Sequence, residues 1–105
     1  MDKDISKIVK KYIHTVLNHQ PNLLSAYIFG SYARNSQRPE SDIDIALVIN
    51  NMSDIDRFDM QVKLMLLASS IDNRIEPHPI SKEELKSNNP FVMEILKTGI
   101  KLDIK

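Results

Sequence analysis

The sequence predicts an α/β domain of the α+β kind, in which helices flank a small mixed β-sheet. Two observations carry this prediction. Apolar residues recur at helical spacing near the N-terminus, and an unbroken apolar run near the middle is typical of a strand that is covered on both faces. Helical and extended patterns then alternate to the end of the chain. The length of 105 residues fits one domain, which we place at residues 1–105.

The first helix is predicted by apolar residues that follow the i, i+3, i+4, i+7 rule from Ile5 to Leu17. Asp2 or Asp4 can cap its start, and Pro21 ends it. Similar patterns predict the other elements. We expect a buried strand at 23–29 and a second strand at 42–49, joined by a polar loop at 31–41 whose residues 31–35 can form one helical turn. A helix from Ser53 or Asp54 to about Ile71 should follow, and then an extended segment at 74–80. The chain should end with a short helix opened by a capping box at 81–84, a helix at 90–98 and an exposed strand at 100–104.

The order of these elements predicts part of the sheet. The loop between the strands at 23–29 and 42–49 is too short for a crossover helix, so these strands should be antiparallel neighbours. The segment at 74–80 contains Pro77 and Pro79. Because proline has no backbone N–H, this segment is expected at a sheet edge or as an irregular strand.

The long helix after the second strand has two apolar stripes, where a surface helix needs only one. One stripe contains Phe58, Val62, Met65, Leu66 and Ser69, and the roughly opposite stripe contains Met60, Leu64, Leu67 and Ile71. Either neighbouring elements cover both stripes, or one of them binds another protein or a second copy of the chain.

Composition excludes several classes of protein. The chain has 14 basic and 14 acidic residues and a formal net charge of zero, which argues against a general nucleic-acid-binding protein. The absence of cysteine excludes disulfides and thiolate metal sites and suits a reducing compartment. The charged N-terminus is unlike a signal peptide, and no apolar run approaches the roughly 20 residues that a membrane-spanning helix needs. We therefore expect a cytoplasmic protein.

The candidate site lies where the first strand ends and the second begins. Gly30 and Ser31 end the first strand, and Asp42 and Asp44 open its expected neighbour. Two residues apart on a strand, the two carboxylates point to the same face and offer Mg²⁺ hard oxygen ligands. Gly30 lets a phosphate approach the backbone, while the Ser31 hydroxyl, nearby N–H groups and Arg34 can bind phosphate oxygens. The residues therefore predict a nucleoside triphosphate and metal site.

This arrangement resembles the polymerase-beta-like nucleotidyltransferase superfamily. Gly30-Ser31, ten residues and then Asp42-Ile43-Asp44 match its GSx10DxD signature. The segments Tyr32-Ala33-Arg34 and 41–45 are similar to those of minimal nucleotidyltransferases (MNT), the antitoxin type, and the resemblance covers nearly the whole chain. It implies the polymerase-beta-like fold. The family often has glycine where this chain has Asn35, and asparagine tolerates the left-handed conformation better than most residues.

The resemblance also implies a third carboxylate on a later strand. Glu76 matches it, either as a metal ligand or as the base that takes the proton of the incoming hydroxyl. The implied reaction uses two Mg²⁺ ions and ATP, with in-line displacement of pyrophosphate at the α-phosphate. His78 shares the strand parity of Glu76. A lone histidine of this kind is more often structural, but a role towards the substrate stays open.

The resemblance further implies a protein acceptor. Related antibiotic-modifying enzymes and polymerases carry additional domains for their acceptors, and this chain has neither the length nor the basic surface for those tasks. Minimal nucleotidyltransferases are typically paired with HEPN toxins, which are ribonucleases, and can neutralise them by adding AMP to a tyrosine. We therefore expect an antitoxin that AMPylates a HEPN partner. Two alternatives stay open: a binding subunit that neutralises its partner by contact, and a subunit that completes its site with another chain to modify a small molecule.

Overall fold

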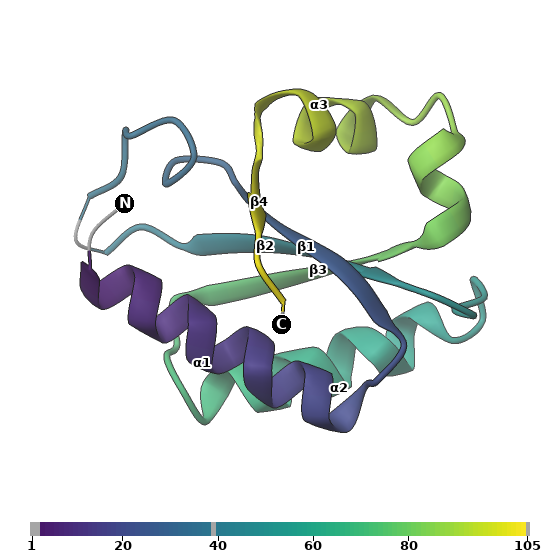
Figure 1. Cartoon of the computed structure of the whole chain (residues 1–105), viewed down its shortest axis with the longest axis horizontal. Helices are drawn as coiled ribbons and strands as arrows, with labels where there is room; N and C mark the ends of the chain where they lie inside the picture. Colours follow the sequence, from purple (N-terminus) through teal and green to yellow (C-terminus); the bar gives the residue numbers. More distant parts are fainter. Residues whose placement is uncertain (1–2, 39, 105) are drawn as a thin grey trace.

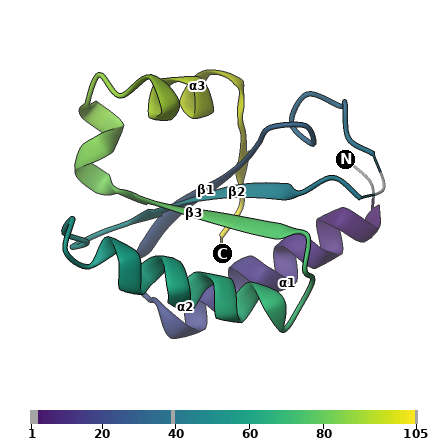
Figure 2. The same ribbon diagram turned by 180° about the vertical axis from the view of Figure 1, so that it is seen from behind.

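The computed structural model describes residues 3–38 and 40–104. It contains α1 (Lys3–His19), β1 (Leu23–Phe29), β2 (Ile43–Ile49), α2 (Arg57–Ser69), β3 (Ile75–Ser81), the 3₁₀ helix η1 (Lys82–Lys86), α3 (Pro90–Thr98) and β4 (Ile100–Leu102). The helices α1 and α2 cover one face of the sheet and α3 lies over the other, as Figures 1 and 2 show from opposite sides. None of the helices in this described part is long and apolar enough to cross a membrane.

The four strands form one mixed sheet in the order β3-β2-β1-β4. β1 is antiparallel to β2, which confirms the expected pairing, and it is also antiparallel to β4. β2 and β3 are parallel, with α2 as their crossover. The mixed sheet with helices on both faces confirms the predicted fold class.

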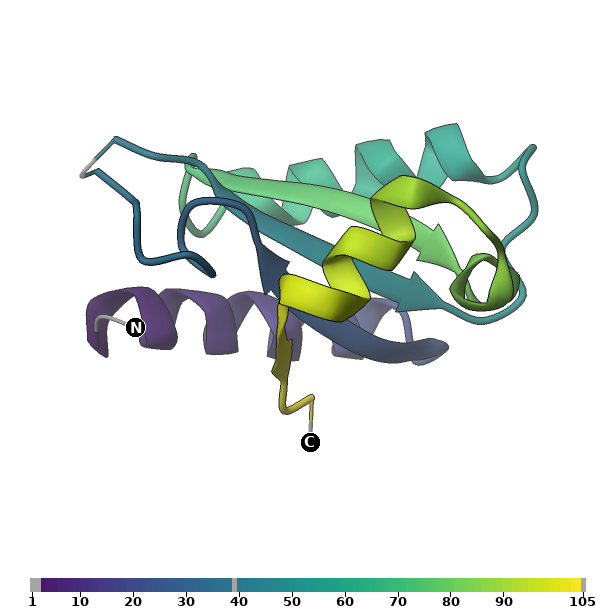
Figure 3. The same ribbon diagram turned by 90° about the horizontal axis from the view of Figure 1, so that it is seen from above.

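The larger core lies between the sheet and the α1–α2 layer. It is built from every second residue of β2, together with apolar side chains of α1 and α2. A smaller core lies under α3, where Val92 and Ile95 pack on Ala46 and Ile80. Both faces of β2 are therefore buried along its second half, which explains its unbroken apolar run. α3 leaves the first part of β2 and β3 uncovered on its own side of the sheet (Figure 3).

β3 lies at the sheet edge, as its prolines predict. The carbonyl oxygens of Pro77 and Pro79 accept hydrogen bonds from side chains of α2, Gln61 at 2.8 Å and Arg57 at 2.9 Å. In a strand, the N–H and C=O of one residue point to the same side, so the missing N–H groups also lie on this outer side. The prolines therefore remove no bond to β2 and leave two edge acceptors for α2.

Several element boundaries differ from the expected ones. The regular part of α2 begins at Arg57, three to four residues after the predicted caps, and ends two residues before Ile71. Ser53 does cap a turn, because its hydroxyl and N–H both face the carboxylate of Asp56, at 2.8 and 3.4 Å. This side-chain pairing forms a separate tight turn before the helix. β2 begins at Ile43, and the last strand covers only residues 100–102.

The ends of α1 and α3 follow their sequence signals. Asp4 lies in the first turn of α1 instead of preceding it, and Asp2 lies outside the described residues. α1 ends two residues before Pro21. In α3, Pro90 occupies the first turn and Asn89 caps it by accepting a hydrogen bond from the N–H of Phe91 at 2.9 Å.

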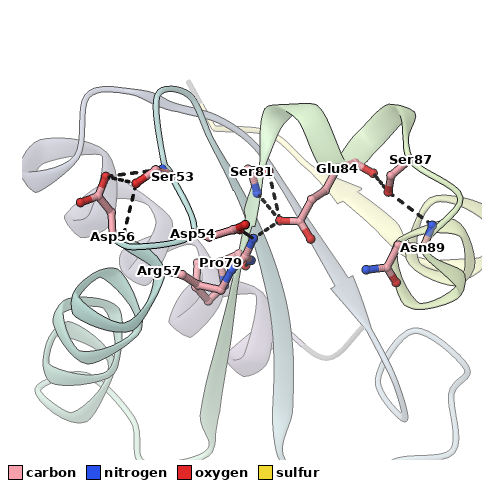
Figure 4. A network of polar contacts seen from close by, with 9 residues as sticks. All are labelled: Ser53, Asp54, Asp56, Arg57, Pro79, Ser81, Glu84, Ser87 and Asn89. Carbon is pink, nitrogen blue, oxygen red and sulfur yellow. Dashed lines mark hydrogen bonds and ion pairs between the residues drawn. The ribbon is translucent and has the colours of Figure 1, made fainter.

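A polar network joins α2, β3 and η1 around Glu84 (Figure 4). The Glu84 carboxylate accepts hydrogen bonds from the N–H and hydroxyl of Ser81, at 3.0 and 3.1 Å, and forms an ion pair with Arg57. This is the Glu half of the predicted capping box. Burial raises the pKa of Glu84, but the hydrogen bonds from Ser81 and Arg57 outweigh it, so the pKa lies below its ordinary value. The network therefore stabilises the fold when Glu84 is ionised.

Replacing Glu84 with glutamine should lower the free energy of unfolding at pH 7 by about 1 kcal/mol. Because the folded-state pKa is lowered, the stabilisation is complete above the ordinary glutamate pKa of about 4.3 and is lost as the pH falls through the lowered value. Urea denaturation at pH 7 and pH 3 should show the difference from the wild type shrinking at the lower pH. The exposed neighbour Glu83, replaced in the same way, should show little effect at either pH.

Only one apolar stripe of α2 is covered. Met60 and Leu64 are buried against the sheet layer, whereas Phe58 is 74% exposed and Leu66 is 65% exposed. Ile55, Val62 and Met65 extend this exposed surface, which we call the outer α2 face. Within the described residues no element covers it, so the interpretation in which neighbouring elements bury both stripes is wrong.

Candidate active site

The end of β1 lies directly beside the start of β2. Phe29, the last residue of β1, pairs with Asp44, so Gly30 follows next to the Asp44 side chain. Gly30 has a φ of +75°, and a Cβ built on it would lie 2.5 Å from Oδ2 of Asp44. Only glycine fits both the left-handed backbone and the close carboxylate. The structure thus brings Gly30 and Asp44 together where β1 ends and β2 begins, as the sequence predicts.

Residues 31–35 form the single helical turn that the sequence suggests. The N–H of Arg34 donates to the carbonyl of Gly30 at 3.2 Å, and the N–H of Ser36 donates to the carbonyl of Ser31 at 2.9 Å. Asn35 between them has a φ of 55°. A left-handed residue followed by a bond that spans the turn is a Schellman-type helix end, for which glycine or asparagine is preferred. Asn35 therefore supplies the conformation that glycine would give.

The three predicted carboxylates lie on one face of the sheet, at the end where β2 and β3 begin. Asp44 and Glu76 are direct partners in the parallel ladder, so their side chains lie side by side on the face that carries α3. Asp42 is exposed and lies one residue before β2, at the same parity as Asp44. In the described ranges neither Asp42 nor Glu76 makes a hydrogen bond or ion pair that would neutralise it. Carboxylates directly opposite one another repel, and a bound cation removes this cost.

The donor set fits Mg²⁺, which uses one or two carboxylates and completes its octahedron with water and phosphate oxygens. A ready-made cage is absent, since the described residues contain no group of three or more His, Asp or Glu side chains close enough to hold a metal ion. Asp44 and Glu76 offer adjacent oxygens on β2 and β3, and Asp42 is free to approach. These residues can hold a metal that arrives together with a substrate phosphate.

The predicted phosphate ligands lie around the same corner. Ser31 is half-buried at the start of the helical turn, next to Gly30. Arg34 is exposed on that turn, and its guanidinium forms no ion pair with other described residues. Tyr32 between them is buried in the core on the α1–α2 side. The turn thus carries one half-buried hydroxyl and one exposed cation within four residues of Gly30.

His78 is a residue that the sequence singled out only by strand parity. Its Nε2 lies 3.3 Å from Oδ1 of Asp44. Its ring contacts Phe29 of β1, with centroids 5.0 Å apart, and Phe91 of α3, with centroids 5.9 Å apart. The parity shared with Glu76 was the available signal, but the contacts to β1 and α3 depend on the tertiary fold.

Residues 11–104 match the family described as polymerase beta, nucleotidyltransferase, and the chain belongs to this family. The curated protein adenylyltransferase MntA of Shewanella oneidensis is 36% identical over 67 residues, which are 63% of this chain and 46% of that protein. The chain thus spans about half the length of this curated relative.

Two solved structures show the same fold. A Sulfolobus solfataricus protein described as a nucleotidyltransferase has a TM-score of 0.65 and 27% identity, over 90% of this chain and 76% of that one. A chain from the complex of the tri-AMPylated Shewanella oneidensis HEPN toxin with its MNT antitoxin has a TM-score of 0.57 and 22% identity, over 94% of this chain and 72% of that one. The fold and the family are those that the GSx10DxD motif implies.

Proposed function

We propose that the chain transfers AMP from ATP to a hydroxyl, with Mg²⁺ bound at the carboxylates of β2 and β3. The observation that carries this proposal is the side-by-side placement of Asp44 and Glu76 beside the Gly30 corner, on the uncovered part of the sheet. Family membership supports the class of reaction, and the predicted ligands Asp42, Ser31 and Arg34 lie within four residues of Asp44 or Gly30 in the chain.

Each residue has a task in this reaction. Gly30, Ser31 and the exposed Arg34 bind the triphosphate, while the aspartates hold the metal. Glu76 serves as a metal ligand or accepts the proton of the acceptor hydroxyl. The hydroxyl oxygen forms a bond to the α-phosphorus, the bond from that phosphorus to the bridging oxygen of pyrophosphate breaks, and pyrophosphate leaves with the electron pair. When bound, Mg²⁺ stabilises the charge that develops on the attacking and leaving oxygens, and a pair of ions can serve both.

We propose a tyrosine of a HEPN-type toxin as the acceptor, so that the chain acts as an antitoxin. The similarity to MntA, described as a protein adenylyltransferase, supports this choice. The fold is also shared with a complex of an MNT antitoxin and an AMPylated HEPN toxin. The acceptor side chain would approach the uncovered face at the Gly30 corner, where Asp44 and Glu76 lie.

The test combines purified protein, ATP labelled on the α-phosphate, Mg²⁺ and the product of the adjacent gene as the candidate partner. Label should appear on a tyrosine of the partner, and EDTA should abolish its transfer. The same reaction with ATP labelled on the γ-phosphate should leave the partner unlabelled. A folded, partner-bound protein that transfers no label would refute the proposal.

The outer α2 face favours a second candidate function, neutralisation of the HEPN-type partner by contact. This surface lies on the sheet face opposite the carboxylates, so a partner held there leaves the site open (Figure 1). Exposed apolar surface of this kind marks a protein interface more often than a bare monomer surface. Contact and catalysis can therefore be separated by substitution.

Replacing Phe58 and Leu66 with serine should weaken binding of the HEPN-type partner at least tenfold, since buried interface anchors contribute more than about 1 kcal/mol each. Thermal stability should change little, because both side chains are exposed. Isothermal titration with the partner measures the change. The matched control is Met93→Ser, which removes an exposed apolar side chain from α3. Equal binding by the double variant and the wild type would exclude this face as the interface.

A further inference from the structure

Both carboxylate oxygens of Asp44 have a fixed neighbour. Oδ2 faces Gly30, 2.5 Å from where a Cβ of that residue would lie, and Oδ1 lies 3.3 Å from Nε2 of His78. An ionised carboxylate can only accept hydrogen bonds, so Nε2 carries the proton and donates it. Among the described residues, Asp44 is the member of the carboxylate group whose side chain has a hydrogen-bonding partner. Its orientation is therefore set before any substrate binds.

The imidazole that donates this bond is itself in contact with two aromatic rings. Phe29 lies against it at 5.0 Å and Phe91 at 5.9 Å between centroids, and the two phenylalanine rings are 5.5 Å apart. Edge-to-face contacts of this kind contribute about 0.5–1.5 kcal/mol beyond burial. The three rings come from β3, β1 and α3. Packing between three elements thus restricts rotation of His78 and fixes the direction of its Nε2.

We propose that His78 is a positioning residue for Asp44. By donating Nε2–H to Oδ1, it holds the carboxylate with Oδ2 towards the Gly30 corner, where the proposed metal and triphosphate bind. This inference rests on the proposed function, and it assigns His78 an action through Asp44 and no contact with the substrate. Partners of metal ligands typically change metal affinity or activity by about 10–100-fold when removed. A separation of 3.3 Å is long for a hydrogen bond, so we expect a change near the lower end of this range, about tenfold.

The same arrangement links α3 to the site. Phe91 is 47% exposed and contacts both His78 and Phe29 from the N-terminal turn of α3. Replacing Phe91 with leucine keeps an apolar side chain but removes the aromatic contact with the imidazole. The effect should be in the same direction as loss of His78, but smaller, because the hydrogen bond to Asp44 remains.

Two substitutions of His78 separate the hydrogen bond from packing. His78→Gln keeps an N–H donor at about the place of Nε2, whereas His78→Leu fills the place of the imidazole beside the rings without a donor. Mn²⁺ binding, measured by titration calorimetry in the presence of a non-hydrolysable ATP analogue, should weaken about tenfold in His78→Leu. Most of this loss should be recovered in His78→Gln. The kcat should fall in parallel, while the KM for the protein acceptor stays unchanged.

A direct measurement on the wild type complements the variants. Long-range ¹H–¹⁵N spectra should show His78 in the form that carries its proton on Nε2, with a changed Nε2 signal in Asp44→Asn. Protonation on Nδ1 alone would overturn the proposal, even if His78→Leu does not fold.

The outcomes also separate this proposal from the function on which it rests. Equal Mn²⁺ binding by the wild type and His78→Leu, with a raised KM for the acceptor, would make His78 a substrate contact and refute the positioning role alone. If the wild type binds Mn²⁺ no better than Asp44→Asn does, the metal site of the proposed function is wrong, and this inference with it.

Discussion

Replacing Asp44 with asparagine should lower the rate of nucleotidyl transfer about a thousandfold or more without unfolding the protein. Loss of an anionic metal ligand removes several kcal/mol of transition-state stabilisation, and about 4 kcal/mol corresponds to a thousandfold. The fold should tolerate the change, because asparagine has the same shape and the like charge opposite Glu76 disappears. Without metal, the free energy of unfolding should be unchanged or slightly raised. The label-transfer assay and urea denaturation measure the two quantities.

Asp59→Asn is the matched control, since it makes the same chemical change on an exposed turn of α2. It should leave transfer unchanged. Full transfer activity in Asp44→Asn would refute the assignment of Asp44 as a metal ligand. A loss of stability above about 2 kcal/mol would show that the carboxylate has a structural role instead, since substitutions without such a role rarely cost so much.

The double variant Asp42→Asn/Asp44→Asn distinguishes catalysis from contact. If AMP transfer neutralises the partner, this variant should still form the complex but fail to protect cells against the toxicity of the partner. If contact alone neutralises, protection should be complete without transfer. Because the outer α2 face lies on the opposite side of the sheet from Asp44, complex formation should not depend on these two carboxylates.

Local sequence signals predict the part of the site that depends on neighbouring strands. Gly30 and Asp44 meet because a short loop forces β1 and β2 to pair as antiparallel neighbours. The prolines of β3 predict its edge position, since an edge strand can lose N–H donors on its outer side. Asn35 adopts the left-handed conformation that its side chain tolerates. In each case a steric or hydrogen-bonding property of a few residues decides the backbone conformation or the position of the strand.

The features that the sequence did not predict depend on distant elements. The contact between His78 and Asp44 requires the register in which β3 lies parallel to β2, and the ring contact between His78 and Phe91 requires α3 to pack on this face of the sheet. Similarly, the periodicity of α2 shows two apolar stripes, but only the packed structure shows which of them is left exposed. α2 begins later than expected because Asp56 accepts a hydrogen bond from Ser53 in a tight turn, and this local bond competes with helix formation at these residues.

Replacing Gly30 with alanine should reduce activity more than stability. The positive φ alone costs alanine about 1–2 kcal/mol. The added methyl would also lie 2.5 Å from Oδ2 of Asp44, so the carboxylate has to move. Urea denaturation should show a loss of about 1–3 kcal/mol. The transfer rate should fall at least a hundredfold, because a displacement of about 1 Å in a catalytic arrangement can cost that much.

Gly99→Ala provides a control for destabilisation without damage to the site. Its Cβ would lie 2.5 Å from the carbonyl oxygen of Ile95 and 3.1 Å from that of Ile28, both backbone atoms. This substitution should destabilise the fold at least as much as Gly30→Ala does, yet leave the remaining folded protein active. Similar activity losses in both variants would mean that Gly30 acts through stability alone.

A double-mutant cycle isolates the contact between Gly30 and Asp44. Asp44→Ala removes the oxygen that the new methyl would meet, so Gly30→Ala should cost less stability in that background than in the wild type. The difference is the free energy of the clash, and the remaining cost is that of the left-handed backbone. Activity should not return, because the metal ligand is absent. Equal costs in both backgrounds would show that the methyl meets no carboxylate, and the close packing of the glycine corner against Asp44 would be refuted.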